Sequence, residues 1–426
     1  MDNDPKMVSA TPLGARREND PIAEPVFVRG EGAYLWDAAG RRYLDFVSGY
    51  SSTLFGHCHP RLVAVAREQL GVLTQVVGLQ HPWRQALESR LAELAPMAMP
   101  AKVWLASTGA RAMEIAWKLA YAYRPGSMVA FDMAYHGRSI ATSLLSDTKR
   151  LPVLNGDVSS TLPFPRCEAC PVGLQPESCH AECFNDSKAW IESNAEKISA
   201  VVVEPAIGAR GYYYAPPVFF RRLREVTQQH GILLIDDEIQ MGLGRFGGLF
   251  ACQSQGWEPD LAILGKSLGG GIVAISAVIG RAKVMDSLPP GYESETFAAN
   301  PLACRLALES LNILVRDRLL DRAELFESWF DSALQALQQK SSVPIRVTCQ
   351  GASGVIEVHA NQATLTVGKR WVTQARDAGL LLHWSGIDRN RIVMIPPLIA
   401  NEAHFCEAFA VLTKIVELDV PLDVAE

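Results

Sequence analysis

The sequence predicts an α/β fold with a mainly parallel sheet, helices on both of its faces, and a smaller α+β domain. Two continuous apolar runs, Ala200–Glu204 and Ile232–Asp236, each end in an acid. Between them, Phe219–Gln229 has the pattern of an amphipathic helix. Strands that are apolar on both faces are typical of parallel sheets that helices cover from both sides. We therefore expect ligands to bind where these strands end, at the carboxyl edge of the sheet.

The other elements follow from apolar periodicity and turn residues, taken in chain order. Residues 1–25 are polar and predict an arm or a poorly ordered segment, and a long helical stretch, about 302–340, leads into a C-terminal α+β portion. We expect an N-terminal arm with part of the small domain over 1–59, a large domain over 60–318, and a C-terminal small domain over 319–426. The remaining predicted elements are short strands over 26–48, helices over about 60–74, 83–95 and 110–123, and strands Val103–Ala106, Met128–Phe131, Leu261–Leu264 and Ala274–Ile279.

The composition excludes several classes of protein. The chain has 426 residues, of which 48% are hydrophobic and 20% charged, so it can bury a large core. Its net charge of −6 leaves no basic surplus to neutralise phosphates, which argues against nucleic acid as a partner. No apolar run is long enough to span a bilayer and the first residues lack a signal-peptide pattern, so we expect a cytoplasmic protein. Nine cysteines in such a chain predict mostly free thiols.

Lys266 and Asp237 are the first candidates for chemistry. Lys266 follows an apolar strand and precedes a serine and three glycines; apolar surroundings lower the pKa of a lysine amine and free it as a nucleophile. Asp237 closes a buried strand, where a carboxylate needs a cationic partner, and Asp236 should point the opposite way. Pyridoxal phosphate (PLP) chemistry needs a lysine that forms a Schiff base and a carboxylate that keeps the pyridine nitrogen protonated. The alternatives are a solvated loop lysine and an aspartate paired with a structural arginine.

Two further segments have the residues to bind parts of a ligand. Ser107–Glu114 joins a strand to a helix, and its small residues leave backbone N–H groups available to an anion at the helix N-terminus. The alternative is an ordinary N-cap at Ser107 or Thr108. In Tyr135–Arg138, the tyrosine ring can stack on a flat heteroaromatic ring. The alternative there is a glycine turn with a partly buried tyrosine.

A segment with four cysteines resembles a zinc site. Its cysteines are separated by two, eight and three residues, and the middle gap is short for a zinc finger. We favour a loop insert with free thiols that can form a disulfide on oxidation, and we predict no metal. The four residues are Cys167, Cys170, Cys179 and Cys183.

Taken together and in order, these motifs resemble those of the class III aminotransferases, a branch of the fold type I PLP-dependent enzymes. The likeness runs from about residue 26 to about residue 415. It implies a PLP-binding large domain with a sheet of the seven-stranded type, transamination with glutamate as amino donor, and a homodimer with shared active sites. The motifs that carry it are Val203–Gly208, Asp237–Gly248, Lys266, Gly56–Pro60, Tyr135–Arg138, Glu295–Pro301 and Pro396–Asn401.

The resemblance also implies roles for individual residues. Lys266 would form the Schiff base and transfer the proton between carbon atoms, and Asp237 would bind the pyridine nitrogen, so these two would be the catalytic residues. Glu204 would lie on the substrate side, and Thr296 would reach the cofactor phosphate of the other subunit. The other cofactor-binding residues would be Thr108, Gly109 and Ala110 at the phosphate, Tyr135 stacked on the ring, His136, and Gln240 near the ring oxygen.

The chain departs from this family where substrates would bind. Many relatives that act on α-amino acids have an arginine three residues before the paired prolines, and here that position is Val393. Arg391 lies two residues away, on the same face of an extended strand, so Arg391 and Glu204 are candidate substrate residues. Without the usual arginine, Glu204 is available to a substrate amino group. This favours an amino sugar of an aminoglycoside pathway over a plain ω-amino acid.

Other functions stay open from the sequence alone. The same scaffold also serves PLP-dependent epimerases and decarboxylating enzymes, and the sequence does not identify which bond is broken. A non-catalytic PLP-fold or metal-binding scaffold is disfavoured by Lys266 and Asp237. A Rossmann-type dehydrogenase is disfavoured because no G-x-G-x-x-G turn follows a first strand.

Overall fold

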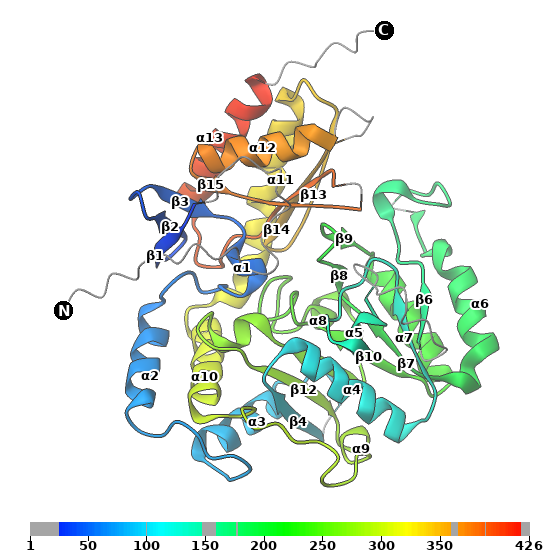
Figure 1. Cartoon of the computed structure of the whole chain (residues 1–426). Coiled ribbons are helices and arrows are strands. Elements are labelled where there is room, and N and C mark those ends of the chain that lie inside the picture. Colours follow the sequence, from blue (N-terminus) through cyan, green and yellow to red (C-terminus); the bar gives the residue numbers. More distant parts are fainter. Residues whose placement is uncertain are drawn as a thin grey trace.

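The large sheet has seven strands, and Figure 1 shows it in the lower half of the molecule. The computed structural model describes residues 25–98, 100–146, 159–175, 178–358, 365–387 and 389–418. The strand order is β4-β12-β11-β10-β7-β5-β6. Only β12, among these strands, runs antiparallel to its neighbours β11 and β4; the pairs β11–β10, β10–β7, β7–β5 and β5–β6 are parallel. The expected mainly parallel sheet is therefore confirmed. Its strands are β4 (Ala101–Ala106), β5 (Ser127–Phe131), β6 (Ser159–Leu162), β7 (Ile198–Val203), β10 (Leu233–Asp237), β11 (Leu261–Leu264) and β12 (Ser276–Arg281).

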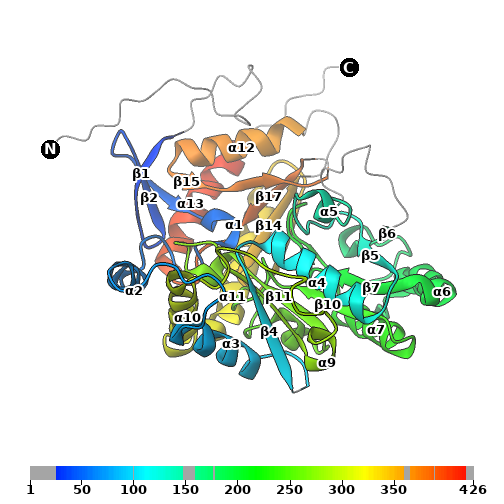
Figure 2. The ribbon, with the colours of Figure 1, turned by 60° about the horizontal axis from the view of Figure 1, so that its bottom comes forward.

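Helices cover both faces of this sheet because its strands are apolar on both faces. Ala200 and Val202 of β7 belong to one buried cluster with the helix α4 (Gly109–Tyr123), which lies along one face of the sheet in Figure 2. Val201 and Val203 point the other way, into the larger core with α7 (Pro217–Gln229). The alternation of side chains along a strand thus fixes which acid at a strand end faces which layer.

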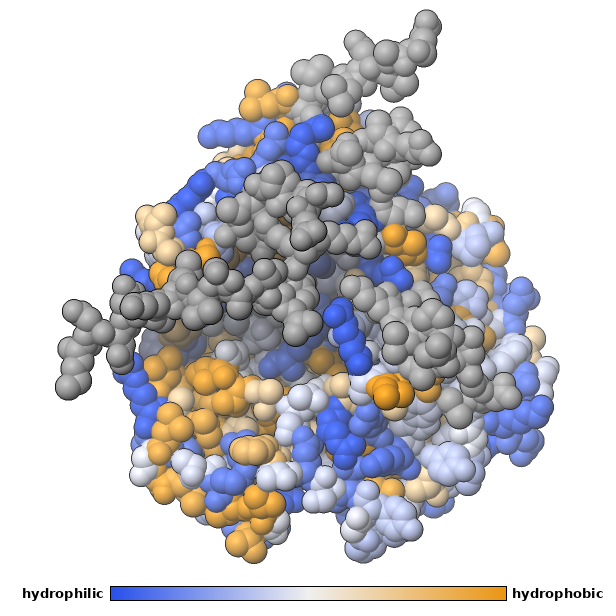
Figure 3. All heavy atoms as spheres, in the orientation of Figure 1, coloured by the Kyte–Doolittle hydropathy of each residue, from blue (hydrophilic) through white to orange (hydrophobic). Residues whose placement is uncertain are grey.

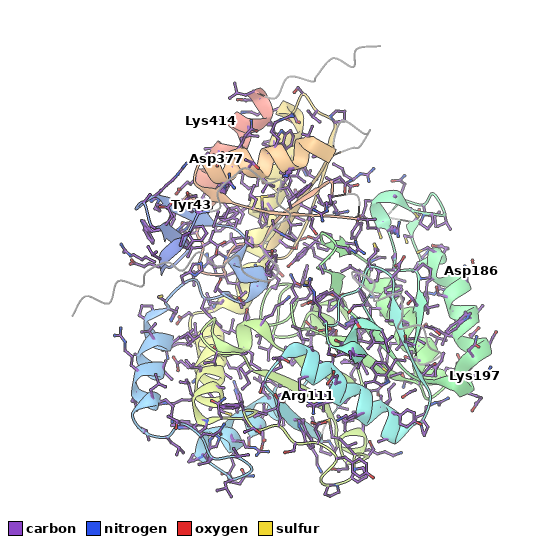
Figure 4. The ribbon with its side chains drawn as sticks, viewed as in Figure 1. Tyr43, Arg111, Asp186, Lys197, Asp377 and Lys414 are labelled. Carbon is purple, nitrogen blue, oxygen red and sulfur yellow. The ribbon has the colours of Figure 1, made fainter. Side chains whose placement is uncertain are left out.

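The two ends of the chain pack together above this sheet. Strand β3 (Arg42–Asp45) pairs in parallel with β15 (Leu380–Leu381), more than three hundred residues later. Figure 4 labels Tyr43 on β3, Asp377 at the end of α12, and Lys414 on α13 in this same upper part of the molecule. The expected boundaries after residues 59 and 318 stay predictions.

The other strands of this part are β1 (Phe27–Glu31), β2 (Tyr34–Asp37), β13 (Ile345–Gln350), β14 (Ser353–Val358), β16 (His383–Ser385) and β17 (Arg391–Met394), and the hairpin β8 (Ala206–Ile207) and β9 (Tyr213–Tyr214) lies between the two halves. Its helices are α11 (Arg322–Lys340), α12 (Leu365–Asp377) and α13 (Glu402–Leu418). The remaining helices are α1 (Ser48–Ser51), α2 (Pro60–Leu70), α3 (Pro82–Glu93), α5 (Ile140–Ser143), α6 (Asn185–Asn194), α8 (Ala251–Gln255), α9 (Ala282–Met285) and α10 (Pro301–Arg316).

The long helix expected over 302–340 is two helices in the structure. Helix α10 ends at Arg316 and α11 begins at Arg322. Arg318 between them has φ 51°, a left-handed conformation that interrupts the helical hydrogen-bond pattern. Neither glycine nor proline marks this break, so the apolar periodicity alone did not reveal it.

Two other expectations concern the whole chain. The arm predicted over residues 1–25 lies outside the described residues, apart from Pro25. Among the helices that the structure describes, none combines the length and the apolar character needed to cross a membrane.

Candidate active site

The predicted site residues meet in a cavity of about 420 Å³ at the carboxyl edge of the large sheet. Each lining segment follows a different strand. Thr108 comes after β4, Tyr135 after β5, Glu204 after β7, Asp237 ends β10, and Lys266 comes after β11. Because the carboxyl ends of parallel strands meet at one edge, residues far apart in the sequence converge there.

Asp237 and His136 form a buried pair at the base of this cavity. His136 Nδ1 lies 2.7 Å from Asp237 Oδ2, and the backbone N–H of Ile239 donates to Asp237 Oδ1 at 3.2 Å. Burial alone would lower the pKa of His136, but the hydrogen bond and the negative charge of Asp237 outweigh burial and raise it. The imidazole thus fixes the carboxylate in place.

Lys266 enters the cavity from the turn after β11. Its φ of 45° is left-handed, a strained conformation for a side chain of this kind, and strain of this type is frequent at functional sites. Its Nζ donates a hydrogen bond to Gln240 Oε1 at 2.7 Å. Burial lowers the pKa of Lys266 to about 8, although Glu204 and Asp237 act in the opposite direction. An amine with this pKa can both accept and donate a proton near neutral pH.

Glu204 closes β7 and faces the same cavity. Its Oε2 accepts a hydrogen bond from the backbone N–H of Tyr135 at 2.9 Å. Burial raises the pKa of Glu204 to about 7, and the negative charge of Asp237 adds to that rise. In the part of the chain that the structure describes, Glu204 has no arginine as an ion-pair partner, and Val393 lies in a buried apolar cluster. The suggested role of Glu204 toward a substrate amino group stays a prediction.

The N-terminus of α4 forms the end of the cavity that suits an anion. Thr108 is the N-cap, and its hydroxyl accepts from the N–H of Arg111 at 3.2 Å. The first N–H groups of a helix lack partners within it, so those of Gly109 and Ala110 are available to a phosphate. A Cβ added to Gly109 would come within 2.8 Å of the Ile239 side chain, so glycine lets this residue pack closely against it. The hydroxyl of Ser107 beside them is buried without a partner.

Arg111 itself turns away from the cavity lining. The labelled Arg111 in Figure 4 lies on the first turn of α4, and its guanidinium binds Glu114 at 3.0 Å and also contacts Glu293. Glu293 is buried and binds Lys118 as well, at 2.8 Å. The arginine therefore neutralises an acid rather than contributing a free positive charge to the anion end.

These features fit PLP. The cavity offers an anion site at one end, the Asp237 carboxylate at its base, a tyrosine on its wall and the Lys266 amine. The buried Ser107 hydroxyl, which has no hydrogen-bond partner in the protein, fits a phosphate at this end. Of the nine cofactor-binding residues expected from the sequence, all but Thr296 line this cavity: Thr108, Gly109, Ala110, Tyr135, His136, Asp237, Gln240 and Lys266.

A second, outer chamber of about 610 Å³ opens onto Lys266 and Gln240. Three arginines line it and no carboxylate does, among the described residues: Arg138, Arg210 and Arg389. The guanidinium of Arg138 lies 5.5 Å from the Tyr135 ring, and that of Arg389 lies 5.3 Å from the Trp384 ring. His383 adds no charge near neutral pH, because burial lowers its pKa to about 4. Because Arg138 and Arg389 add positive charge and no described lining residue is acidic, the outer chamber is electropositive at these two arginines.

Sequence reasoning missed Arg210, His383 and Arg389 of this chamber. They come from three separate segments and belong to no recognisable motif. Only Arg138 carried a signal, through its place in the segment that begins at Tyr135.

Thr296 lies apart from both cavities. Its side chain is exposed, and its backbone carbonyl accepts a hydrogen bond from Gln75 Nε2 at 3.1 Å. Its expected reach to a neighbouring subunit stays a prediction.

Arg391 also lies outside both cavity linings, as a fully buried residue. Its guanidinium donates to Glu168 at 2.6 Å, to Glu357 at 3.2 Å and to the carbonyl of Tyr212 at 3.0 Å, and it stacks 4.0 Å from the Tyr213 ring. Two carboxylates already balance its charge, so the suggestion that Arg391 binds substrate finds no support in this geometry.

The four cysteines of the insert lie near one another, since, besides burial, the charges of Cys170, Cys179 and Cys183 all raise the pKa of Cys167, and the prediction that they bind no metal stays a prediction. Among the described residues, the one group with three ligand atoms within 4.8 Å of one another is Asp236, Glu238 and Cys252, on the far side of β10. Burial raises the pKa of Glu238 to about 7, and burial together with the charge of Glu238 raises that of Asp236 well above its usual value. A shared proton between the two carboxyl groups accounts for this cluster.

Comparison with known proteins gives one consistent answer. The family model described as aminotransferase class-III matches residues 15–416. The 5-aminovalerate aminotransferase of Pseudomonas aeruginosa is 34% identical over 95% of this chain and 96% of its own length. The leucine/methionine racemase of Thermococcus litoralis is 30% identical over 95% and 93%. A solved ornithine aminotransferase from Toxoplasma gondii, with PLP at partial occupancy in its active site, is 29% identical with a TM-score of 0.81 over 95% of this chain and 92% of its own. The chain therefore belongs to the class III aminotransferases, fold type I enzymes that use PLP.

Proposed function

We propose that this protein transfers the amino group of an ω-amino carboxylate to a 2-oxo acid. The observation that carries the proposal is the electropositive outer chamber, which opens directly onto Lys266 and Gln240. A substrate whose amine reaches Lys266 would leave its other end among the three arginines. A carboxylate is the group that arginine binds best, through paired charge-assisted hydrogen bonds.

The chemical step rests on the residues of the inner cavity. Bound PLP accepts the electron pair that is left when a proton leaves the amine-bearing carbon. Lys266 Nζ, with a pKa of about 8, takes that proton and returns it at another carbon. The Asp237 carboxylate, fixed by His136 at 2.7 Å, holds the proton on the pyridine nitrogen. Gln240 orients the Lys266 amine through its side-chain carbonyl.

The amino-sugar substrate is the second candidate. Glu204 has no arginine partner among the described residues, and a carboxylate so placed can receive a second amino group of the substrate. Arg138 and Arg389 in the outer chamber favour a carboxylate instead, because a carboxylate pairs with a guanidinium through charge-assisted hydrogen bonds and a sugar hydroxyl does not. The named relatives act on 5-aminovalerate and ornithine.

Racemisation is a further possibility on the same scaffold, because one relative is a leucine/methionine racemase. That reaction breaks the same carbon–hydrogen bond but returns the proton to the same carbon. Incubation with donor in deuterated water without a 2-oxo acid separates the two reactions. Transamination converts the bound cofactor to its amine form, whereas racemisation leaves it unchanged and labels the recovered substrate.

The substrate proposal is tested by three donors that differ at the far end. The donors are 5-aminovalerate, pentylamine, which has the same chain length without the carboxylate, and glucosamine. We expect 5-aminovalerate to exceed pentylamine in kcat/KM by about 10- to 100-fold, the value of a charged hydrogen bond. Conversion of the bound cofactor is followed by its absorbance.

Substitutions in the outer chamber test the same proposal. Arg138→Gln and Arg389→Gln should each reduce the ratio of kcat/KM for 5-aminovalerate to that for pentylamine, whereas Lys414→Gln on the distant α13 should not. Equal rates for pentylamine, or faster conversion by glucosamine, would contradict the proposal.

We also propose a homodimer. Figure 3 shows apolar side chains gathered at the lower left of this face, where Figure 1 draws α2 and the chain after it. The hydrogen bond from the Gln75 side chain to the Thr296 carbonyl joins this segment to the loop that carries Phe297, which is 67% exposed. An exposed apolar surface of this kind favours association, and the particle mass in solution tests it. The cytoplasmic location stays a prediction. The exposed apolar side chains at the end of α2 and just after it are Leu70, Val72, Val77 and Leu79.

A further inference from the structure

The hairpin β8–β9 has a strained turn beside the catalytic lysine. Tyr212, the residue just before β9, is buried and has φ 61°, a left-handed conformation that a bulky residue rarely adopts. Gly211 before it has φ 108°. Strain of this kind persists only where the surroundings hold it. The contacts that hold this turn therefore indicate what the turn is for.

Arg391 stabilises this turn through direct contacts with Tyr212 and Tyr213. Its Nη2 donates to the Tyr212 carbonyl at 3.0 Å, and its guanidinium lies 4.0 Å from the Tyr213 ring. A Cβ added to Gly211 would come within 3.0 Å of the Arg391 side chain, so the two pack tightly. The turn cannot move without breaking these contacts.

Arg391 in turn depends on the four-cysteine insert. Glu168 lies between Cys167 and Cys170, in a short 3-10 helix, and its carboxylate accepts from Arg391 Nη1 at 2.6 Å. Burial disfavours the charge of Arg391, but Glu168 outweighs it and raises the arginine pKa. The backbone carbonyl of Glu168 also accepts from Arg346 Nη1 at 2.5 Å. The insert is thus attached to the body of the protein at this residue.

The other side of Tyr212 reaches the active site. Its hydroxyl accepts a hydrogen bond from Gln240 Nε2 at 2.8 Å, and Gln240 Oε1 accepts from Lys266 Nζ at 2.7 Å. The lysine needs an acceptor, so the amide oxygen must face it and the amide N–H must find an acceptor elsewhere. The Tyr212 hydroxyl is that acceptor, which fixes the orientation of the amide.

We propose that Tyr212 is a positioning residue for the transamination reaction: held by Arg391 and by Glu168 of the four-cysteine insert, it orients the Gln240 amide that faces Lys266. The insert acts through the Glu168 carboxylate, which lies outside the linings of the inner cavity and the outer chamber. The inference rests on the proposed role of Lys266, but on no particular substrate. A loss of activity in Lys266→Ala tests that role separately.

The experiment uses the PLP-loaded enzyme and titrates the visible absorption of the bound cofactor against pH. Tyr212→Phe keeps the ring and removes the acceptor, so Gln240 loses its orientation. The protonated nitrogen of Lys266 then loses an acceptor, and we expect the absorption midpoint to fall by about one pH unit. We also expect kcat to fall about tenfold, with KM for the amino donor nearly unchanged.

A double-variant comparison separates positioning from a general structural effect. In a Gln240→Ala background, Tyr212→Phe should shift the midpoint by less than about 0.2 units, because the amide through which it acts is gone. Glu168→Gln should shift it in the same direction by a smaller amount. The matched control is Glu324→Gln. Glu324 is exposed and lines the same surface cavity as Glu168, outside the active site, so its substitution should leave the absorption midpoint unchanged. An unchanged midpoint in Tyr212→Phe, or an equal shift with and without Gln240, would overturn the proposal.

Discussion

Strand β10 ends in two neighbouring carboxylates that face opposite sides of the sheet, and the two sides treat them differently. Asp237 faces the cavity, where His136 lies 2.7 Å away and the Ile239 N–H donates to it. Asp236 faces the core, where its neighbour Glu238 is a second carboxyl group and the two share a proton. The cavity side provides N–H donors for a carboxylate, and the core side places another acid beside it. The partners beside each carboxylate, and not its depth, thus distinguish a functional charge from a protonated structural group.

The largest expected effect lies on the cavity side, at Lys266. Lys266→Ala removes the amine that both attaches the cofactor and moves the proton, so we expect kcat to fall by about four orders of magnitude or more. Borohydride reduction followed by mass spectrometry should show the cofactor fixed to the parent protein and absent from the variant. Lys414→Ala, at the labelled position on α13 in Figure 4, is the control and should behave as the parent. Cofactor still fixed to the Lys266→Ala protein would contradict the assignment.

The same substitution at the two neighbouring acids tests the comparison directly. Asp237→Asn removes the charge that holds the proton on the pyridine nitrogen, and we expect kcat to fall by about two to three orders of magnitude while cofactor remains bound. Asp236→Asn makes the identical chemical change one residue away, on the core side, and should leave turnover close to that of the parent. Steady-state rates at saturating cofactor measure both. Equal losses in the two variants would show that the two faces of β10 are not functionally distinct.

Much of this contrast could be predicted from the sequence. A continuous apolar strand ending in Asp236 and Asp237 indicates a buried sheet, and the alternation of side chains places the two acids on opposite faces. Lys266 follows the next strand, so the carboxyl edge brings it to Asp237. These inferences succeed because they depend on local periodicity and on one general property of parallel sheets. The catalytic roles drawn from the family resemblance stay predictions.

What the sequence could not give depends on contacts between distant segments. The charge of Arg391 is balanced by Glu168, 223 residues earlier in the chain, so strand alternation alone suggested a substrate role that the geometry does not support. The electropositive chamber likewise joins Arg138 to Arg389 across separate segments. The break near Arg318 carries neither glycine nor proline. In each case the deciding information is three-dimensional packing, which a single sequence pattern does not contain.

The smallest expected effect concerns stability and lies on the core side of β10. Burial raises the pKa of Glu238 from 4.5 to about 7, so the folded protein keeps a proton that the unfolded chain releases. Stability from this group is complete below pH 4.5 and is lost as the pH rises through 7. Asp236→Asn removes one carboxyl of the pair, and its amide can donate to Glu238. The variant should exceed the parent's unfolding free energy by less at pH 4.5 than at pH 8, where the gain should be on the order of 2 kcal/mol. Urea unfolding at both pH values measures this, with the exposed Asp377→Asn as control. A gain of equal size at both pH values would show that the shared proton is not its cause.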